Sequence, residues 1–390
     1  MNKIAIVSCY FQKNYGSMLQ AYATQLFFDQ HGIYNETICI DGFKKDIKKS
    51  KLRYFLRRIG SIEVLGDKAG YAGLIIRKNT NSALKRQLKV RSDMFDAFVQ
   101  THFHLSEAAT REGLPQMAGK YEAVIVGSDQ LWLPSNIYAD FYTLNFVPEG
   151  IKKLSYATSF GVSSLPQWQL EAAKHFLNRM DHISVRENTG RDIIKRLTGR
   201  DAVVVCDPTL LFDAGQWEKI QKPGPEVSER YIFCYFLGNN PEQRAFAMRL
   251  RQATGYKIIA LLHLDQYIKS DNQFADMAPF DIGPAEFLTL ISHAEFICTD
   301  SFHCSVFSIL YRKNFCCFKR FKKASAVSTN SRIHSLFQRL GLQDRLLTGE
   351  EDVFEYIGKE IDYAGVHEKL KAFRAESVQF LQEALHLRQE

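Results

Sequence analysis

Short apolar runs recur along the chain, each long enough for a buried strand, and stretches with helical spacing of apolar residues separate them. The first run covers residues 4–8, and a helix with one apolar face is predicted for residues 17–30. This alternation continues and is typical of parallel sheets that carry helices on both faces. Further strands are predicted at residues 36–40, 122–126, 154–157, 183–185, 203–206, 231–237, 257–262, 296–298 and 315–318.

The length of 390 residues suits two domains better than one core, because single cores rarely exceed about 250–300 residues. Residues 213–229 contain Pro223, Gly224 and Pro225 with mixed charge, so they are the predicted linker. We expect an α/β protein with two Rossmann-like domains, residues 1–222 and 223–350, that face each other across a cleft. Residues 351–390 are expected to form a closing helical segment.

The first domain is predicted to contain a basic helical insertion at about residues 44–104. Its first part, residues 44–58, interleaves lysines and arginines with large apolar residues, and residues 82–104 predict a second, long helix. A solvated helix face explains the basic pattern without any function. The alternative is a peripheral contact with an anionic membrane or with a lipid-linked diphosphate, which basic amphipathic helices favour.

Composition narrows the class of protein further. Apolar residues at 46% and charged residues at 24% describe an ordinary globular chain. The net charge of +7 favours anionic substrates and is not by itself a nucleic-acid signature, so no nucleic-acid partner is predicted. Eight cysteines lie mostly in apolar runs without CxxC spacing, which predicts buried free thiols. With no signal-peptide pattern and no long apolar run, we expect a cytoplasmic protein, with the basic segment as its contact with the inner face of the membrane.

Polar residues gather where the predicted strands end. Any one of them would be explained as a helix cap or turn residue. Taken together they are more informative, because the carboxyl ends of parallel strands form the edge at which α/β proteins bind ligands. The residues are Asn14, Tyr15, Ser128, Asp129, Gln130, Ser159, Arg186, Glu187, Asp207, Gly238, Asn239, Asp300, Ser301 and His303.

Two of these residues have the chemistry of a catalytic site. Arg186 directly follows a buried strand and suits a bidentate grip on phosphate or carboxylate, although an ion pair with Glu187 or another carboxylate would also explain it. His303 lies in the first turn of a helix, and histidine ordinarily titrates near neutral pH. A lone helical histidine is commonly structural, but this one follows a strand-ending Asp300. The neighbouring Cys304 is interpreted as a packing residue, since no base is paired with it in the sequence.

Motifs for metals and nucleotide cofactors are not evident. There is no HExxH motif, no paired-cysteine site and no carboxylate cluster with metal spacing. The first strand-to-helix turn holds Asn14-Tyr15-Gly16 in place of G-x-G-x-x-G, so a dinucleotide site is not supported. The sequence therefore predicts neither a metal site nor a cofactor.

Several motifs in a fixed order resemble the polysaccharide pyruvyl transferase family over roughly residues 3–345. The combination is more specific than any single motif, while the basic insertion and the last helix fall outside it. The motifs are Asn14-Tyr15-Gly16, Leu19-Gln20-Ala21-Tyr22, Val126-Gly127-Ser128-Asp129-Gln130-Leu131-Trp132, Ser155-Tyr156-Ala157-Thr158-Ser159-Phe160-Gly161, Ser184-Val185-Arg186-Glu187, Cys206-Asp207-Pro208-Thr209-Leu210-Leu211 and Thr299-Asp300-Ser301-Phe302-His303.

The resemblance implies a GT-B-like pair of domains and transfer of a pyruvyl unit from phosphoenolpyruvate to a sugar. The product would be a pyruvate ketal bridging two hydroxyls, with phosphate released, in the synthesis of a polysaccharide such as an exopolysaccharide or of a lipid-linked glycan precursor. His303 matches the family's histidine and is the predicted acid/base, while Arg186 matches its strand-end arginine and is the predicted donor clamp. The remaining predicted substrate-binding residues are Asn14, Tyr15, Ser128, Asp129, Gln130, Ser159, Asp300 and Ser301.

The chain departs from part of this family at Ser301. Some branches look to carry Arg-x-His in this turn, whereas here the turn is Ser301-Phe302-His303. The missing donor cation would then come from Arg312, Lys319 or Arg332. Two other functions remain open, a GT-B-type glycosyltransferase that uses a nucleotide sugar and a non-catalytic glycan-binding protein.

Overall fold

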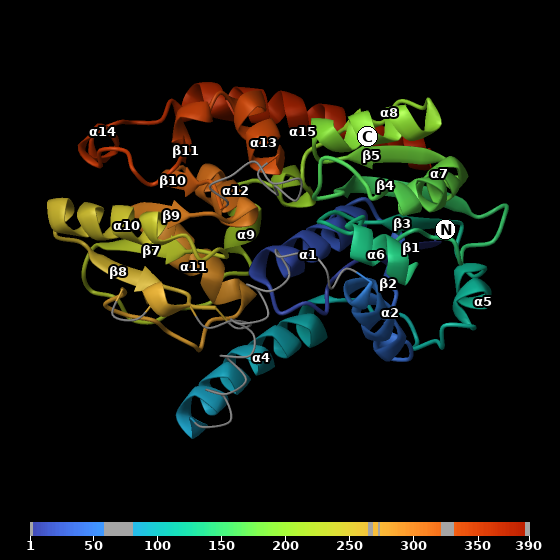
Figure 1. Cartoon of the computed structure of the whole chain (residues 1–390), viewed down its shortest axis with the longest axis horizontal. Helices are drawn as coiled ribbons and strands as arrows, with labels where there is room; N and C mark the ends of the chain where they lie inside the picture. Colours follow the sequence, from blue (N-terminus) through green and yellow to red (C-terminus); the bar gives the residue numbers. More distant parts are fainter. Residues whose placement is uncertain (1–2, 58–80, 264–267, 272–273, 321–330, 387–390) are drawn as a thin grey trace.

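The computed structural model describes residues 3–57, 81–263, 268–271, 274–320 and 331–386. Two separate sheets, each flanked by helices, form the molecule (Figure 1). All strand pairs between the named strands are parallel. This arrangement confirms the predicted α/β class.

The first sheet has six strands in the order β2-β1-β3-β4-β5-β6. β1, β3 and β4 are almost entirely buried, as expected for central strands that helices cover on both faces. The strands are β1 (Lys3–Val7), β2 (Tyr34–Thr37), β3 (Ala123–Val126), β4 (Lys152–Thr158), β5 (His182–Val185) and β6 (Val203–Val204).

The second sheet has five strands in the order β11-β10-β9-β7-β8. The predicted strands at 231–237, 257–262, 296–298 and 315–318 all appear in it, whereas the two-residue β11 was not predicted. The strands are β7 (Tyr231–Tyr235), β8 (Lys257–Ala260), β9 (Phe296–Thr299), β10 (Asn314–Phe318) and β11 (Leu346–Leu347).

Fourteen α-helices are described among the residues of the two sheets and their connections. The predicted insertion contains α2 and α4, and the part of it at residues 58–80 lies outside the described residues. The helices are α1 (Tyr15–Gln30), α2 (Lys44–Leu56), α4 (Ser82–His102), α5 (Leu114–Ala118), α6 (Pro134–Ala139), α7 (Leu170–Arg179), α8 (Asn188–Thr198), α9 (Ala214–Glu218), α10 (Pro241–Thr254), α11 (Pro284–His293), α12 (Phe302–Leu310), α13 (Ser331–Leu340), α14 (Phe354–Ile357) and α15 (Tyr363–Leu385).

The boundaries of two elements differ from the predicted ones because backbone amides there donate hydrogen bonds to side-chain oxygens. α1 begins at Tyr15, because Oδ1 of Asn14 accepts a hydrogen bond from the Ser17 amide and caps the helix there. β2 ends before the predicted strand at 36–40 does. There the amides of Cys39 and Ile40 donate to the hydroxyls of Ser106 and Tyr10. The predicted linker at 213–229 contains the short helix α9 before its irregular part.

Contacts between the two halves hold the sheets in one arrangement. Tyr15 at the start of α1 stacks on Phe287 of α11 with ring centroids 4.5 Å apart. On α4, the buried Arg91 donates to the carbonyl oxygens of Leu262, Pro279 and Phe280. The insertion helix α4 therefore ties the first half of the chain to loops of the second.

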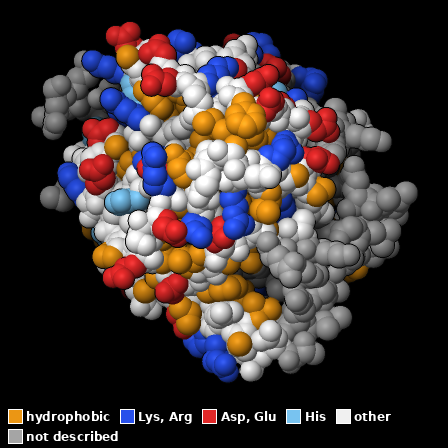
Figure 2. Space-filling view, turned by 90° about the vertical axis from the view of Figure 1, so that its left-hand side faces the viewer, with side chains coloured by type: hydrophobic (Ala, Val, Ile, Leu, Met, Phe, Trp, Pro, Cys, Tyr) orange, Lys and Arg blue, Asp and Glu red, His pale blue; other side chains and the backbone are white. Residues whose placement is uncertain are grey.

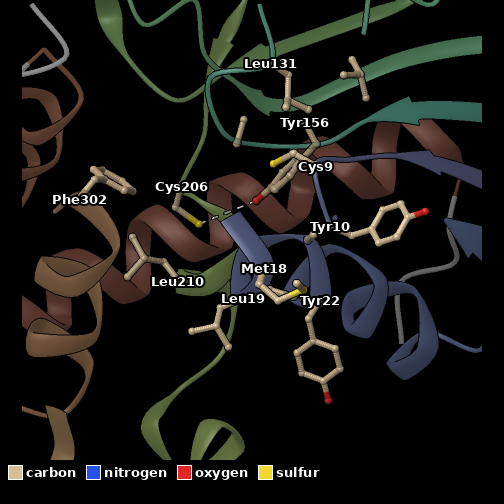
Figure 3. Packing of buried hydrophobic residues seen from close by; sticks show 14 of the residues in the cluster. Cys9, Tyr10, Met18, Leu19, Tyr22, Leu131, Tyr156, Cys206, Leu210 and Phe302 are labelled. Carbon is tan, nitrogen blue, oxygen red and sulfur yellow. Dashed lines mark hydrogen bonds between the residues drawn. The ribbon is translucent and has the colours of Figure 1, made fainter. Parts of the chain in front are cut away.

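The long C-terminal helix α15 returns from the second sheet to the first and lies across the top of both in Figure 1. Its Ser377 hydroxyl accepts a hydrogen bond from the Cys206 amide at 2.9 Å, and Arg374 donates to the carbonyl oxygens of Leu210 and Phe212. Figure 3 shows the neighbouring core, where Cys206 lies beside Tyr156 of β4. This is the predicted closing helix. The domain boundaries at 222 and 350 remain a prediction.

The cysteines are buried, and the surface is that of an ordinary globular protein. All eight cysteines are free and buried. The face over the second sheet intersperses acidic, basic and apolar side chains (Figure 2). Among the described helices, none is long and apolar enough to cross a membrane.

Candidate active site

The carboxyl ends of both sheets face a common cleft, which contains a cavity of about 220 Å³. We call it the cleft cavity. Residues that follow β1 and β3 line one wall, and residues from the β9–α12 turn and α13 line the other. The polar and charged side chains in the lining are Gln12, Asn14, Ser17, Lys51, Asp129, Gln130, Ser135, Asn136, Ser301, His303, Arg320 and Arg332.

His303 lies in the first turn of α12, where the Ser301 hydroxyl caps the helix by accepting from the Cys304 amide. The histidine is only 6% exposed. Its Nε2 lies 3.4 Å from Oδ2 of Asp207, which is ion-pair distance, yet Nε2 has no hydrogen-bond partner among the described residues. A buried polar atom without a partner is costly, and such atoms are frequent where a substrate binds.

Asp207 is the fixed anion behind His303. Arg186 donates to its Oδ2 at 2.6 Å and Ser128 donates to the same oxygen at 2.8 Å, while Thr209 occupies Oδ1. Burial alone would raise the pKa of this carboxyl. The charges of His303 and Arg186 and the hydrogen bonds outweigh that effect and hold its pKa well below the usual range. Asp207 is therefore ionised at any physiological pH.

Asp129 is a second ionised carboxylate and lines the cavity itself. Its Oδ2 accepts from the Ser17 hydroxyl at 2.5 Å, and its Oδ1 lies 3.5 Å from Arg186 and 3.7 Å from Arg332. Burial opposes its ionisation, but Arg186, His303 and Arg332 lower its pKa to about 2. Its backbone has φ of 79°, an unusual conformation for a residue other than glycine and one that clusters at functional sites.

Phe302 separates two buried arginines. The guanidinium carbon of Arg186 lies 4.4 Å from the ring centroid and that of Arg332 lies 5.8 Å from it, so both make cation–π contacts. Burial and the charge of Arg186 lower the pKa of Arg332 to about 9, although Asp129 and Glu187 oppose the shift. The Nε atom of Arg332 has no hydrogen-bond partner among the described residues. Arg332 is therefore a buried cation that the protein alone compensates only in part.

Asp300 joins three strand ends and does not line the cavity. Its two carboxylate oxygens accept from the amides of Leu237 and Gly238, and Arg320 donates to its carbonyl oxygen at 3.0 Å. The Arg320 Nε also lies 3.6 Å from Oδ2 of Asp300. Asp300 thus holds Arg320 at the wall of the cavity.

The structure brings together only part of the predicted substrate-binding set. Asn14, Asp129, Gln130, Ser301 and His303 line the cleft cavity. Arg186 lies beneath it, with its terminal nitrogens on Asp207 and Asp129, and lines an adjacent cavity of about 410 Å³. The two share Phe302 as a wall residue.

Besides Asp300, three predicted residues face neighbouring protein groups. The Tyr15 hydroxyl donates to the carbonyl oxygen of Ile282 at 2.9 Å, in the packing between the two halves. The Ser128 hydroxyl donates to Asp207 and to the carbonyl of Ala157. Ser159 donates to Glu187 at 2.8 Å, and burial raises the pKa of that glutamate. These residues support the site from behind.

Among the residues at the site that sequence reasoning missed are Gly16, Ser17, Lys51 and Arg320. Ser17, Lys51 and Arg320 line the cavity, and Gly16 packs against the imidazole of His303. Gly16 belongs to the Asn14-Tyr15-Gly16 motif and Ser17 follows it directly, so proximity to a motif was their only signal. Lys51 is one of many basic residues in its segment, and no spacing separates it from the others.

Of the three cations considered as replacements for an arginine at Ser301, only Arg332 lines the cavity. Arg312 lines a different cavity, beside α9 and α15, and the Lys319 amide donates to the carbonyl of Leu347.

As for metals, the described part of the chain contains no group of three His, Cys, Asp or Glu residues placed to hold an ion.

Comparison with solved structures shows the fold. UDP-N-acetylglucosamine 2-epimerase from Rickettsia bellii is similar with a TM-score of 0.51 at 10% identity, covering 98% of this chain and 96% of that one. A glycosyltransferase from Streptomyces nogalater has a TM-score of 0.43 at 10% identity, covering 99% of each chain. The overall fold is GT-B-like, with two parallel α/β halves. At this identity the likeness concerns the fold alone.

Comparison by sequence gives the family. No match was found among curated proteins. A family model described as polysaccharide pyruvyl transferase matches residues 14–320, which include the Asn14-Tyr15-Gly16 turn, Arg186 and His303. This match covers most of the chain, including all strands of the two sheets except β1 and β11. The chain belongs to the polysaccharide pyruvyl transferase family, a family of enzymes.

Proposed function

We propose that this protein transfers the pyruvyl unit of phosphoenolpyruvate to a sugar, forming a ketal across two hydroxyls and releasing phosphate. The observation that carries the proposal is the position of His303. Its buried Nε2 lies 3.4 Å from Asp207 and has no hydrogen-bond partner among the described residues, and His303 lines a cavity that arginines and an ionised aspartate also line. That combination suits proton transfer to an anionic enol ether.

The donor is placed against the second-sheet wall of the cleft cavity. Phosphoenolpyruvate carries a phosphate and a carboxylate, and Arg332 and Arg320 are the cavity-lining arginines. A bound anion would compensate the charge of Arg332, whose burial now lowers its pKa. In this arrangement Arg332 supplies the cation that Ser301 does not.

His303 supplies the proton that starts the reaction. In this proposal His303 acts as the imidazolium, and the Asp207 carboxylate 3.4 Å from Nε2 is its counterion. The imidazolium donates its proton to the methylene carbon of the donor, which leaves an oxocarbenium-like carbon at C2. A sugar hydroxyl attacks C2, and its proton passes to the now neutral His303.

The second bond to the sugar replaces the phosphate. The C2–O bond to phosphate breaks, the phosphate takes the bonding electrons, and the second hydroxyl attacks the regenerated oxocarbenium. Its proton leaves with the phosphate as hydrogen phosphate, so the methyl group and the released phosphate account for both hydroxyl protons. Asp129, with a pKa of about 2, is too weak a base for these transfers; its fixed negative charge stabilises the developing cation.

Arg186 takes a supporting part in this proposal. Its guanidinium lies against both Asp207 and Asp129, so its main effect is to fix the two carboxylates relative to His303 and Phe302. The predicted contact with the donor would use its Nε, which has no hydrogen-bond partner among the described residues. Arg186 would then assist the cavity-lining arginines.

The acceptor is proposed to be a sugar of a polysaccharide or of a lipid-linked glycan precursor, modified at the inner face of the membrane.

Incubation with phosphoenolpyruvate and a panel of glycans tests the reaction. Phosphate release that depends on the glycan, with a pyruvate ketal in the product, supports the proposal. Release of a nucleoside diphosphate from nucleotide sugars would identify a glycosyltransferase instead, and saturable glycan binding without turnover would identify a binding protein.

A further inference from the structure

One lysine of the basic helix α2, Lys51, lines the candidate active site. Ile47, Lys51 and Tyr54 are spaced i, i+4 and i+7, so they share one face of the helix. Ile47 and Tyr54 are buried on that face, and the ring of Tyr54 lies 6.0 Å from that of Tyr138 on α6. Lys51, between them, lines the cleft cavity, whereas Lys48 and Lys49 are exposed.

The ammonium group of Lys51 has no hydrogen-bond or ion-pair partner in the described part of the chain. Burial lowers the pKa of Lys51, and this effect outweighs the opposing effect of the neighbouring Cys9, whose own pKa is raised by burial. A partly buried cation without a counterion costs free energy. An anion bound beside it would remove that cost.

Lys51 comes from the first half of the chain, whereas the arginines proposed to bind the donor come from the second half. It lies with Gln12, Leu131 and Ser135 on the first-sheet wall, and Arg320 and Arg332 lie on the second-sheet wall. A phosphoenolpyruvate held by the arginines leaves Lys51 for another anion. Lysine binds phosphate as a compact point charge with three donors, which suits a phosphoryl or diphosphate group of variable geometry.

We propose that Lys51 binds a phosphoryl or diphosphate group of the acceptor while the donor occupies the opposite wall. This inference rests on the proposed function, because that function places the donor at the arginines. It gives the basic insertion a role within the site and predicts that the accepted sugar is carried on a phosphate-containing molecule.

Calorimetric titration of inorganic pyrophosphate into the full chain, with and without saturating phosphoenolpyruvate, tests this proposal. The variant is Lys51→Gln, and the matched control is Lys48→Gln, one turn earlier on the exposed face. We expect the wild type to bind pyrophosphate together with the donor. Lys51→Gln should weaken pyrophosphate binding by at least about tenfold, the effect of losing one charged hydrogen bond, and leave donor affinity unchanged. Lys48→Gln should change neither.

Other outcomes would overturn the proposal in distinguishable ways. A loss of donor affinity in Lys51→Gln would assign Lys51 to the donor's phosphate. If inorganic phosphate shows Lys51-dependent binding that the donor abolishes, the lysine serves the released product. Equal pyrophosphate binding by wild type and Lys51→Gln would show that no second anion uses this lysine. If phosphoenolpyruvate fails to bind the wild type, the proposed function fails, while the pyrophosphate titration still decides the role of Lys51.

Discussion

Gly16 of α1 packs directly on the imidazole of His303. A Cβ atom added to Gly16 would lie 2.2 Å from Nδ1 of the histidine and 2.5 Å from its Cγ. These two residues come from opposite halves of the chain, so the contact fixes the histidine against the first helix of the first half. With Asp207 at Nε2 and Gly16 at Nδ1, the ring has little freedom to move.

Gly16→Ala should therefore displace His303 without unfolding the protein. Gly16 lies in the first turn of α1, where alanine is a better helix former than glycine, so the backbone itself tolerates the change. A shift of about 1 Å in a catalytic group commonly costs about 100-fold in rate. We expect acceptor-dependent phosphate release to fall by about that factor, with a thermal midpoint within a few degrees of the wild type.

Gly358→Ala is the matched control, because no atom lies within 4 Å of the added Cβ and φ there is −100°. It should leave both rate and thermal midpoint unchanged. Wild-type activity in Gly16→Ala would contradict the view that this contact positions the histidine.

The contact explains what could and could not be predicted from the sequence. The Asn14-Tyr15-Gly16 motif is visible as a strand-end cluster, and His303 is visible as a helical histidine after a strand-ending aspartate. Gly16 and His303 are 287 positions apart in the sequence, so the steric contact between them could not be predicted, because strand and helix periodicity is a local signal. The same reason explains Tyr15, which sequence position placed at the site and which the structure places in the packing between the halves.

His303→Ala should abolish turnover while the fold is retained. The expected loss is about 100- to 10,000-fold, the usual contribution of a general acid–base group. Because the side chain is buried, alanine also leaves a cavity, so His303→Gln provides a better-filled companion variant. Circular dichroism and phosphoenolpyruvate affinity separate loss of chemistry from loss of structure. A folded His303→Gln enzyme with wild-type turnover would exclude the histidine as the acid.

Arg332→Leu should weaken donor binding without destabilising the free protein. The charge of Arg332 is buried at a cost, as its pKa of about 9 indicates, and removing it also removes that cost. We expect the thermal midpoint to stay the same or rise and the dissociation constant for phosphoenolpyruvate to increase by at least about tenfold.

Arg339→Leu, seven residues further along α13, is the control for this variant. Arg339 is half-exposed and pairs with Glu376, and it does not line the cleft cavity. It should leave donor affinity unchanged. Equal donor affinity in the wild type and Arg332→Leu would remove Arg332 from the donor site.

The substitution at Ser301 shows a second limit of sequence reasoning. The sequence shows directly that this turn has no arginine. It offers three cations further along the chain as replacements, Arg312, Lys319 and Arg332, and does not show which of them lies near the turn in space. Only the packing of α13 beside Phe302 brings Arg332 to the cavity. Strand positions and fold class were predictable from local periodicity, whereas the partners of a buried charge depend on tertiary packing.

Acid should destabilise the protein through Asp129 between pH 4 and pH 2. The folded pKa of about 2 lies below the ordinary value of 3.8, so the ionised form stabilises the fold above pH 3.8 and this contribution is lost as pH falls toward 2. A shift of this size corresponds to about 2 kcal/mol. Urea unfolding of the wild type and of Asp129→Asn at pH 5 and pH 2.5 measures it. The wild type should lose about 2 kcal/mol more than the variant, and equal losses would contradict the pairing with Arg186 and Arg332.

The outer face of α2 should bind anionic lipid. Leu52, Phe55 and Leu56 are 59%, 45% and 55% exposed, and the same helix carries the exposed basic residues Lys45, Lys48, Lys49 and Arg53. Such a surface binds vesicles through apolar insertion and attraction to anionic head groups. We expect sedimentation with phosphatidylcholine vesicles only when phosphatidylglycerol is included, and less at high salt because screening weakens the attraction. Replacing Leu52 and Phe55 with serine should abolish sedimentation, whereas Phe354→Ser, at the exposed α14, should not change it.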